Sequence, residues 1–144
     1  MTKNIVVFIF VVLLSMVDQI IKVKILNSSA VYHIWGDFLN ISLTKNFGVF
    51  ASIPFNYSEV VVVFILALLI FSFKKYNFVS MFPYFLITLF GIISNLIDRI
   101  RYDFVIDYIN FFNLSHFNIA DLLIYIGCFG IIWKITKSNK LKIS

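Results

Sequence analysis

Long apolar runs, interrupted by one short alternating stretch, dominate this chain. A helix that crosses a membrane needs about 20 mostly apolar residues. The apolar runs predict helices near residues 4–26, 56–74, 79–98 and 119–136. The fold class expected from this pattern is an all-α membrane protein with four transmembrane helices, built as a single domain over residues 1–144.

The hydrophobic period changes between the first two expected helices. Apolar and polar residues alternate over 39–44, and this period of two is typical of a half-buried β-strand. A partner strand is expected over 31–35, which gives a small β-sheet near residues 31–44. We also expect an interfacial segment over 46–56 and a second extended stretch over 104–109.

The composition agrees with a membrane environment. Hydrophobic residues make up 61% of the chain and charged residues 13%, whereas a soluble domain carries about 25% charged residues. The net charge of +5 would suggest nucleic acid, but its distribution along the chain argues against that partner, so we expect membrane lipids instead. One cysteine excludes an internal disulfide framework, and the few potential ligands lack the spacing of a metal site, so no metal and no cofactor are expected.

The charges predict an orientation in the membrane. With four spans, seven of the twelve basic residues lie on the side of both termini, and the positive-inside rule places that side in the cytoplasm. All seven acidic residues fall on the opposite, extracytoplasmic half: Asp18, Asp37, Glu59, Asp98, Asp103, Asp107 and Asp121. The positive-inside rule gives carboxylates little weight, so it does not explain this segregation. A carboxylate-based site at the outer face, near the expected sheet, would explain it.

Two of these carboxylates suit peptide hydrolysis. Asp107 and Asp121 can meet if the connection between them folds back on itself. Two carboxylates about 3 Å apart share one proton, so one can act as a base on water while the other protonates the scissile carbonyl. This chemistry needs neither a metal nor a covalent intermediate.

A purely structural role also fits several of these residues. Asn118 and Asp121 are typical of a helix start, with Asn118 as the N-cap and Asp121 in the first turn. Asp98 beside Arg99 suits an interfacial ion pair.

The alternative function is a small ion-coupled membrane transporter that uses Asp98, Asp107 and Asp121 as a proton relay. A relay of this kind should place its carboxylates near the bilayer midplane. Here the carboxylates cluster at one edge, which favours an enzyme.

Five short motifs occur in a fixed order along the chain. They are Asp18-Gln19-Ile20-Ile21-Lys22, Asn46-Phe47-Gly48-Val49, Asn95-Leu96-Ile97-Asp98-Arg99, Val105-Ile106-Asp107-Tyr108 and Phe117-Asn118-Ile119-Ala120-Asp121. Each motif is weak alone. Together, in this order and at these topological positions, they resemble the motifs of the lipoprotein signal peptidases, the signal peptidase II family of aspartyl membrane proteases.

The resemblance implies an aspartic endopeptidase of the bacterial plasma (inner) membrane. Such an enzyme removes the signal peptide from diacylglyceryl-modified prolipoproteins by cutting before the lipidated cysteine. Asp107 and Asp121 would be catalytic, Asp18 and Lys22 would be structural, and the protein is expected to be a monomer. The residues expected to bind substrate or support the catalytic pair are Asn46, Gly48, Asn95, Asp98, Arg99 and Asn118.

The sequence departs from the family pattern at a few positions. Ser94 and Asp103 stand where the family usually has Gly, Tyr108 where it has Phe, and Phe50-Ala51 in place of Ala-Phe. The family's Gly at position 103 predicts a turn with positive φ, which Asp adopts more readily than most residues. We therefore expect Asp103 to replace that Gly in the backbone, with a carboxylate that faces water and carries no catalytic proton.

Overall fold

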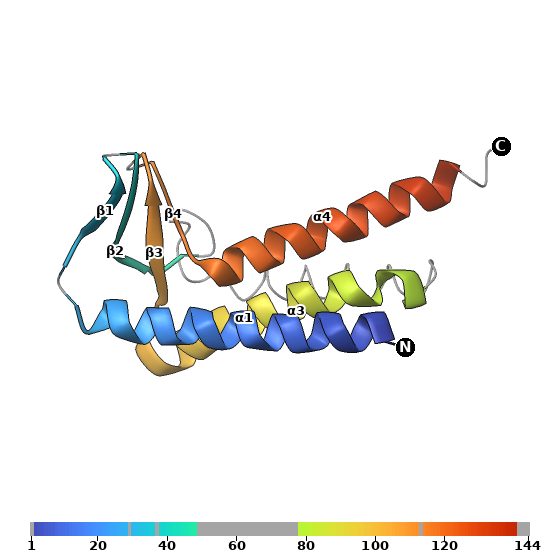
Figure 1. Ribbon diagram of the computed structural model, residues 1–144, viewed down its shortest axis with the longest axis horizontal. Helices are drawn as coiled ribbons and strands as arrows, with labels where there is room; N and C mark the ends of the chain where they lie inside the picture. The colour runs from blue at the N-terminus through green and yellow to red at the C-terminus, as the bar shows by residue number, and fades with distance from the viewer. Residues whose placement is uncertain (1, 29, 37, 49–77, 113, 141–144) are drawn as a thin grey trace.

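The computed structural model describes residues 2–28, 30–36, 38–48, 78–112 and 114–140. The helices among these residues are α1 (Thr2–Leu26), α3 (Phe78–Tyr102) and α4 (Ile119–Lys140). The strands are β1 (Tyr32–Trp35), β2 (Leu39–Asn46), β3 (Val105–Phe111) and β4 (Ser115–Phe117). The three helices run lengthwise, and the strands gather near one end and stand across the helix direction (Figure 1).

The expected all-α class with four transmembrane helices is wrong. The described residues form a four-stranded antiparallel sheet in the order β1-β2-β3-β4. Three helices among them are long and apolar enough to cross a membrane: Asn4–Leu26, Val79–Tyr102 and Ile119–Ser138. The helix expected over 56–74 and most of the interfacial segment expected over 46–56 lie outside the described residues.

The strands expected near residues 31–44 are confirmed as β1 and β2, and the extended stretch expected over 104–109 is confirmed as β3. Two features of the sequence concealed the full sheet. The sequence predicts β3 only as an extended stretch without a partner, because its first four residues are all buried and lack the alternation of a half-exposed strand. β4 has only three residues, which is too short for a periodic signal.

The sheet register brings distant segments of the chain together. β2 and β3 pair so that Thr44 lies opposite Asp107 and Asn46 opposite Val105. β4 then returns along β3, with Phe117 opposite Ile109. Since α4 begins two residues after Phe117, this short return places the start of α4 beside the middle of β3.

Small residues allow α4 to approach α3 closely. A side-chain carbon added at Gly127 would overlap Thr88, and one added at Gly130 would overlap the ring of Tyr84. Glycine at such positions lets membrane helices pack backbone against backbone. The contact holds α4, and with it the first turn that carries Asp121, against α3.

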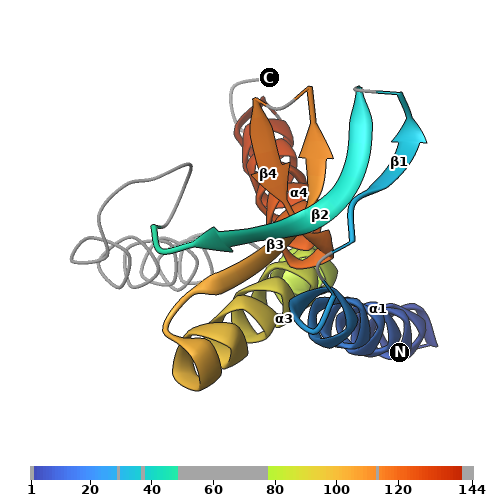
Figure 2. The same cartoon turned by 90° about the vertical axis from the view of Figure 1, so that its left-hand side faces the viewer.

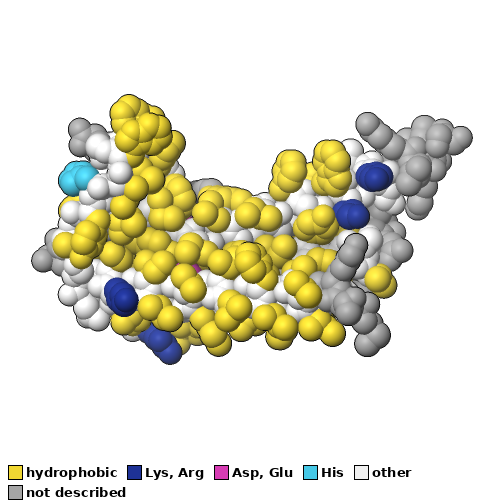
Figure 3. Space-filling view, viewed as in Figure 1, with side chains coloured by type: hydrophobic (Ala, Val, Ile, Leu, Met, Phe, Trp, Pro, Cys, Tyr) yellow, Lys and Arg dark blue, Asp and Glu magenta, His cyan; other side chains and the backbone are white. Residues whose placement is uncertain are grey.

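Apolar side chains cover the helices on the outside, while a group of charged side chains lies inside. Hydrophobic atoms dominate the face in Figure 3, and acidic atoms are scarcely visible there. Asp18, Lys22, Asp98 and Asp107 are at most 1% exposed. Burying charge is costly unless the groups are paired and hydrogen-bonded, so the interior must hold a connected polar network.

Asp103 has the expected backbone conformation. Its φ is 64°, its side chain is exposed, and its backbone N–H donates to the carbonyl of Arg99 at 3.0 Å. A residue in the left-handed region commonly follows a helix and satisfies its last carbonyls. Asp103 therefore ends α3 and turns the chain into β3.

Candidate active site

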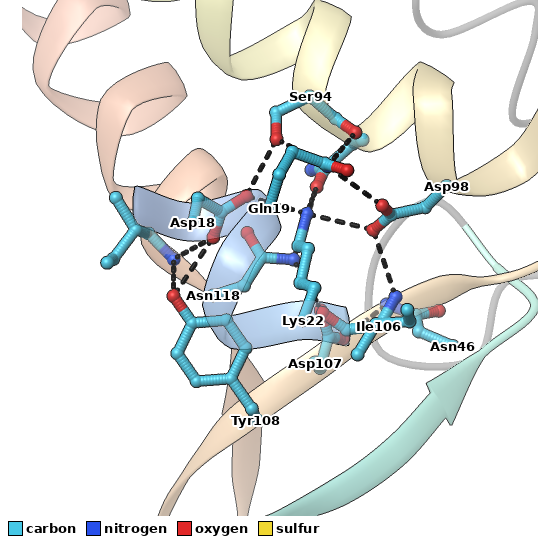
Figure 4. A network of polar contacts seen from close by, with 12 residues as sticks. Asp18, Gln19, Lys22, Asn46, Ser94, Asp98, Ile106, Asp107, Tyr108 and Asn118 are labelled. Carbon is cyan, nitrogen blue, oxygen red and sulfur yellow. Dashed lines mark hydrogen bonds and ion pairs between the residues drawn. The ribbon is translucent and has the colours of Figure 1, made fainter. Parts of the chain in front are cut away.

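A buried polar network lies where α1, α3, β3 and the start of α4 meet. Figure 2 shows the sheet lying across the ends of the helices, and Figure 4 shows the side chains that converge beneath it. All of the site residues predicted from the sequence take part: Asp18, Lys22, Asn46, Gly48, Asn95, Asp98, Arg99, Asp107, Asn118 and Asp121.

Asp107 lies on β3 and is held by two side-chain amides. Asn46, near the end of the paired strand β2, donates through Nδ2 to Oδ2 of Asp107 at 2.9 Å. Asn118 donates through Nδ2 to Oδ1 at 2.8 Å. Burial, followed by the negative charge of Asp121, raises the pKa of Asp107 to about 7, against the lowering effect of these hydrogen bonds and of Lys22. Asp107 can therefore hold or release a proton near neutral pH.

Asp121 occupies the first turn of α4, and the helix-start interpretation of its motif is correct. Asn118 accepts from the backbone N–H of Asp121 through Oδ1 at 2.9 Å, and Asp121 accepts from the backbone N–H of Asn118 through Oδ2 at 3.1 Å. This reciprocal arrangement has the geometry of a capping box. It leaves Oδ1 of Asp121 for a partner on another helix, Asn95, whose Nδ2 donates at 2.8 Å.

Asn118 connects the two carboxylates. Its backbone N–H contacts Asp121, and its side-chain Nδ2 contacts Asp107. The fold thus brings Asp107 and Asp121 to one small residue, although 13 positions separate them in the sequence. The capping role and a chemical role for Asp121 are compatible because they use different oxygens.

Lys22 is the buried cation of the network. Its Nζ lies 2.8 Å from Oδ2 of Asp18, which confirms the ion pair predicted within α1. It also lies 2.8 Å from Oδ2 of Asp98 and donates to Oδ1 of Asn95 at 2.9 Å. Asp98 thus pairs with a lysine from another helix, in addition to any contact with its sequence neighbour Arg99.

The donors around Asn95 and Asn118 determine which way each amide faces. A lysine ammonium is a donor only, so the amide oxygen of Asn95 must face Lys22 and its nitrogen must face Asp121. The backbone N–H of Asp121 is likewise a donor, so the oxygen of Asn118 must face it and the nitrogen must face Asp107. Both amides therefore present N–H groups to the two carboxylates.

Asn46, Gly48 and Arg99 form the side of the network next to β2. Oδ1 of Asn46 accepts from the backbone N–H of Gly48 at 2.9 Å, and Arg99 donates through Nη2 to the carbonyl of Gly48 at 2.9 Å. These contacts hold the chain just after β2 against α3. They also orient the amide of Asn46, because its oxygen faces a donor and its nitrogen then faces Asp107.

Sequence reasoning did not identify three further members of the network. Ser94 donates through Oγ to Oδ2 of Asp18 at 2.7 Å, and Tyr108 donates through its hydroxyl to Oδ1 of Asp18 at 2.9 Å. Gln19 donates through Nε2 to Oδ1 of Asp98 at 3.0 Å. Burial, and then the charge of Asp18, raise the pKa of Tyr108, which therefore stays a neutral donor.

The arrangement suits proton transfer by a carboxylate pair. Two of the network's four carboxylates, Asp18 and Asp98, are paired with Lys22. The other two, Asp107 and Asp121, are held by amides. In the described part of the chain, no group of three or more His, Cys, Asp or Glu side chains is arranged to hold a metal ion.

The raised pKa of Asp107 predicts a pH-dependent stability. Its folded-state pKa of about 7 lies above the ordinary value of 3.8, so its contribution to stability is fully present below the unfolded pKa and is lost as pH rises through about 7. Asp107→Asn removes this titration, at the cost of one hydrogen bond. The melting temperature of the variant relative to the natural protein should therefore rise between pH 5 and pH 8.

Thermal unfolding of both proteins in detergent at each pH would measure this difference. The effects of groups that titrate in both proteins largely cancel in the difference between the two melting temperatures. The change in this difference with pH therefore reports on position 107. A constant difference between the two melting temperatures across this pH range would contradict the prediction.

Comparison with known proteins adds independent evidence. A family model described as Signal peptidase (SPase) II matches residues 9–137. A lipoprotein signal peptidase from Halothermothrix orenii is 28% identical over 142 residues, which cover 94% of this chain and 98% of that protein. Another from Buchnera aphidicola is 43% identical over 82 residues, which cover 54% of this chain and about half (51%) of that relative.

Solved structures show the same architecture. A bacterial membrane enzyme determined by the in meso method at 1.9 Å resolution superposes with a TM-score of 0.69 at 26% identity, covering 94% of this chain and 93% of that one. A second, at 2.3 Å resolution, gives a TM-score of 0.75 at 26% identity and covers 99% of this chain and 92% of that one.

Proposed function

This chain belongs to the signal peptidase II family, and we propose that it is an aspartic endopeptidase that removes signal peptides from diacylglyceryl-modified prolipoproteins. Asp107 and Asp121 are the proposed catalytic pair. The observation that carries the assignment is the position of Asn118, which contacts both carboxylates, one through its side chain and one through its backbone.

The proposed reaction uses one proton shared by the pair. Burial and the charge of Asp121 make full ionisation of Asp107 unfavourable at neutral pH, so the pair retains a proton and titrates as a unit. One carboxylate takes a proton from water, which attacks the scissile carbonyl, while the other gives its proton to the carbonyl oxygen. The resulting tetrahedral intermediate collapses when a proton is passed to the leaving amine.

The surrounding amides keep the two carboxylates in place during this cycle. Each oxygen of Asp107 accepts from one amide, and each oxygen of Asp121 accepts from one N–H. Bracing of this kind limits rotation of the reacting groups, and loss of such alignment is costly in catalysis. Asn46, Asn95 and Asn118 are therefore proposed to be positioning residues for the pair.

The location of the pair fits a substrate anchored in the membrane. The family relatives and the three apolar helices indicate a bacterial membrane protein. Asp107 lies on β3 and Asp121 lies in the first turn of α4, which would place the scissile bond near the membrane surface, where the helices meet the sheet (Figure 1). We propose that a diacylated prolipoprotein reaches it from the bilayer, that the chain acts as a single domain and a monomer, and that it needs no cofactor.

The proposed orientation places the sheet outside the plasma membrane and both termini in the cytoplasm. The start of α1 and the end of α4 lie at the end of the molecule opposite the sheet (Figure 1). In a Cys128→Ser background, an impermeant thiol reagent added to intact cells should label Ser42→Cys on β2 but not a cysteine at position 139. Labelling of position 139 from outside would reverse the assignment.

Asp103 offers a test of the assignment of the carboxylates. Asp103→Gly should keep turnover and raise the melting temperature slightly, since Gly adopts a φ of 64° without strain. Asp103→Val should lower stability by about 1–2 kcal/mol, because a bulky side chain resists this conformation. Turnover and thermal unfolding would be measured for both variants. If Asp103→Gly lost activity, Asp103 would belong to the chemistry.

The activity itself can be tested directly. Purified protein in detergent would be incubated with a prolipoprotein in its diacylated and its unmodified form, and release of the signal peptide would be followed by mass spectrometry. The proposal expects cleavage before the lipidated cysteine and little or none in the unmodified protein. Absence of cleavage by a folded, monodisperse preparation would count against the proposed function.

A further inference from the structure

The free end of the sheet carries a cluster of aromatic rings. Trp35 ends β1 and Phe38 lies in the turn that leads to β2, and their ring centroids lie 6.0 Å apart. The turn between β3 and β4 presents Phe112, which lies 4.7 Å from Phe38 and 4.6 Å from Phe111. We call these four residues, together with Leu114 in the second turn, the aromatic tip.

A backbone hydrogen bond joins the two turns. The N–H of Phe112 donates to the carbonyl of Phe38 at 2.8 Å, so a direct bond ties the two halves of the aromatic tip together although they are more than 70 residues apart in the sequence. Phe112 has a φ of 56°, a conformation that is unfavourable for a bulky residue. Such strain persists only where the surroundings hold it, and it often marks a functional position.

The aromatic tip is apolar but not buried. Trp35 is 74% exposed and Leu114 is 86% exposed, while Phe38, Phe111 and Phe112 are each about half exposed. Figure 3 shows hydrophobic atoms gathered at this free end of the sheet. A contiguous exposed patch of this kind indicates a surface that is covered in the working protein.

The chain connections place this patch at the membrane surface. Only Asp103 and Phe104 separate α3 from β3, and only Asn118 separates β4 from α4. The sheet therefore cannot lie far from the plane in which these spans end. In Figure 1 the strands stand across the helix direction beside the last turns of α1, so the aromatic tip extends sideways from the helices at that level.

We propose that the aromatic tip inserts into the interfacial layer of the lipid bilayer. Trp is enriched at this layer, and Trp, Phe and Leu form the embedded face of elements that lie in it. Insertion would fix the depth of β3, and with it Asp107, relative to the surface. The exposed rings and the chain connections support this insertion whatever reaction the protein catalyses.

The two tryptophans of the chain allow a direct measurement. Trp133→Phe leaves Trp35 as the only tryptophan, and Trp35→Phe leaves Trp133 on α4, which is 61% exposed on a candidate span. Each full-length variant would be placed, one copy per disc, in phosphatidylcholine nanodiscs with acyl chains brominated either near the headgroup or near the chain end. Trp133 serves as the control for a side chain on a membrane span.

The proposal expects Trp35 to fluoresce at shorter wavelength than free tryptophan, to resist aqueous iodide, and to be quenched most by bromine near the headgroup. Water-like emission with strong iodide quenching would overturn it. Protection of Trp35 from iodide that appears only with two copies per disc would also overturn it, because a second copy of the chain would then cover the tip. Protection that appears only after a substrate peptide is added would overturn it as well.

A second variant separates insertion from folding. Phe112→Asn removes a ring but keeps a residue that tolerates positive φ, so the protein should fold. In the Trp133→Phe background, this change should reduce the quenching of Trp35 by headgroup-proximal bromine and increase quenching by iodide. Unchanged quenching in a folded Phe112→Asn protein would show that the tip does not act as one inserted unit.

Discussion

Asp107→Asn and Asp121→Asn should each lower turnover on the order of 10⁴-fold or more, because catalytic groups that act as a unit fail together. An amide can neither take a proton from water nor give one to a carbonyl oxygen under these conditions. Each Asn keeps the size of the original side chain and loses one of its two accepted hydrogen bonds. The proteins should therefore still insert and fold.

The double variant makes the prediction sharper. If the two carboxylates share one proton, Asp107→Asn/Asp121→Asn should be no worse than either single change. Independent roles would instead multiply the two losses. Asp103→Asn is the matched control, since it removes an exposed carboxylate four residues before Asp107 and should keep turnover. Near-normal turnover in either single variant would remove that residue from the catalytic pair.

Patterns within one segment predicted much of the fold. Long apolar runs located α1, α3 and α4, and alternation located β2. The fold class was wrong because the extended stretch that became β3 carries no signal of its partner, and because β4 is very short. Their places in the sheet depend on the pairing of β3 with β2 and of β4 with β3, which no single segment encodes.

The same limit applies to the candidate site. The order of the motifs predicted ten site residues. The spacing around Asp121, however, suited a helix cap as well as a catalytic role. In the structure, Asp121 takes part in the cap of α4 through Oδ2, while Oδ1 accepts from Asn95 on another helix, so capping leaves one oxygen for another partner. Likewise, Asp98 and Lys22 form an ion pair between α1 and α3, and a pair across two helices has no fixed spacing in the sequence.

Two departures from the family pattern have a common structural basis. Ser94 stands where Gly is usual and Tyr108 where Phe is usual, and both of the added hydroxyls donate to Asp18, one to each carboxylate oxygen. In this chain, Asp18 is thus supported from α3 and from β3 at once. In this chain, both hydroxyls therefore help to hold Asp18 in its buried ion pair with Lys22.

Lys22→Met should both destabilise the protein and reduce its activity. Removing the cation leaves Asp18 and Asp98 buried without their ion partner, a change that costs about 3–5 kcal/mol in other buried pairs. It also removes the ammonium, the shorter of two donors to the oxygen of Asn95, so the amide is held less firmly in the orientation that presents its N–H to Asp121. Loss of one such oriented donor costs about 10²-fold in turnover. Lys24→Met, an exposed position on the same helix, is the matched control for both measurements.

A triple variant separates the two effects of this lysine. Asp18→Asn/Lys22→Met/Asp98→Asn removes the unpaired charges together with the cation, so most of the lost stability should return. Turnover should stay low, because the oxygen of Asn95 has lost Lys22, one of its two donors. It keeps only the longer bond from Asn118, at 3.1 Å. Thermal unfolding and turnover would be measured on the same preparations. Recovery of stability without recovery of turnover identifies Lys22 as the residue that orients Asn95 toward Asp121, whereas joint recovery would assign it to folding alone.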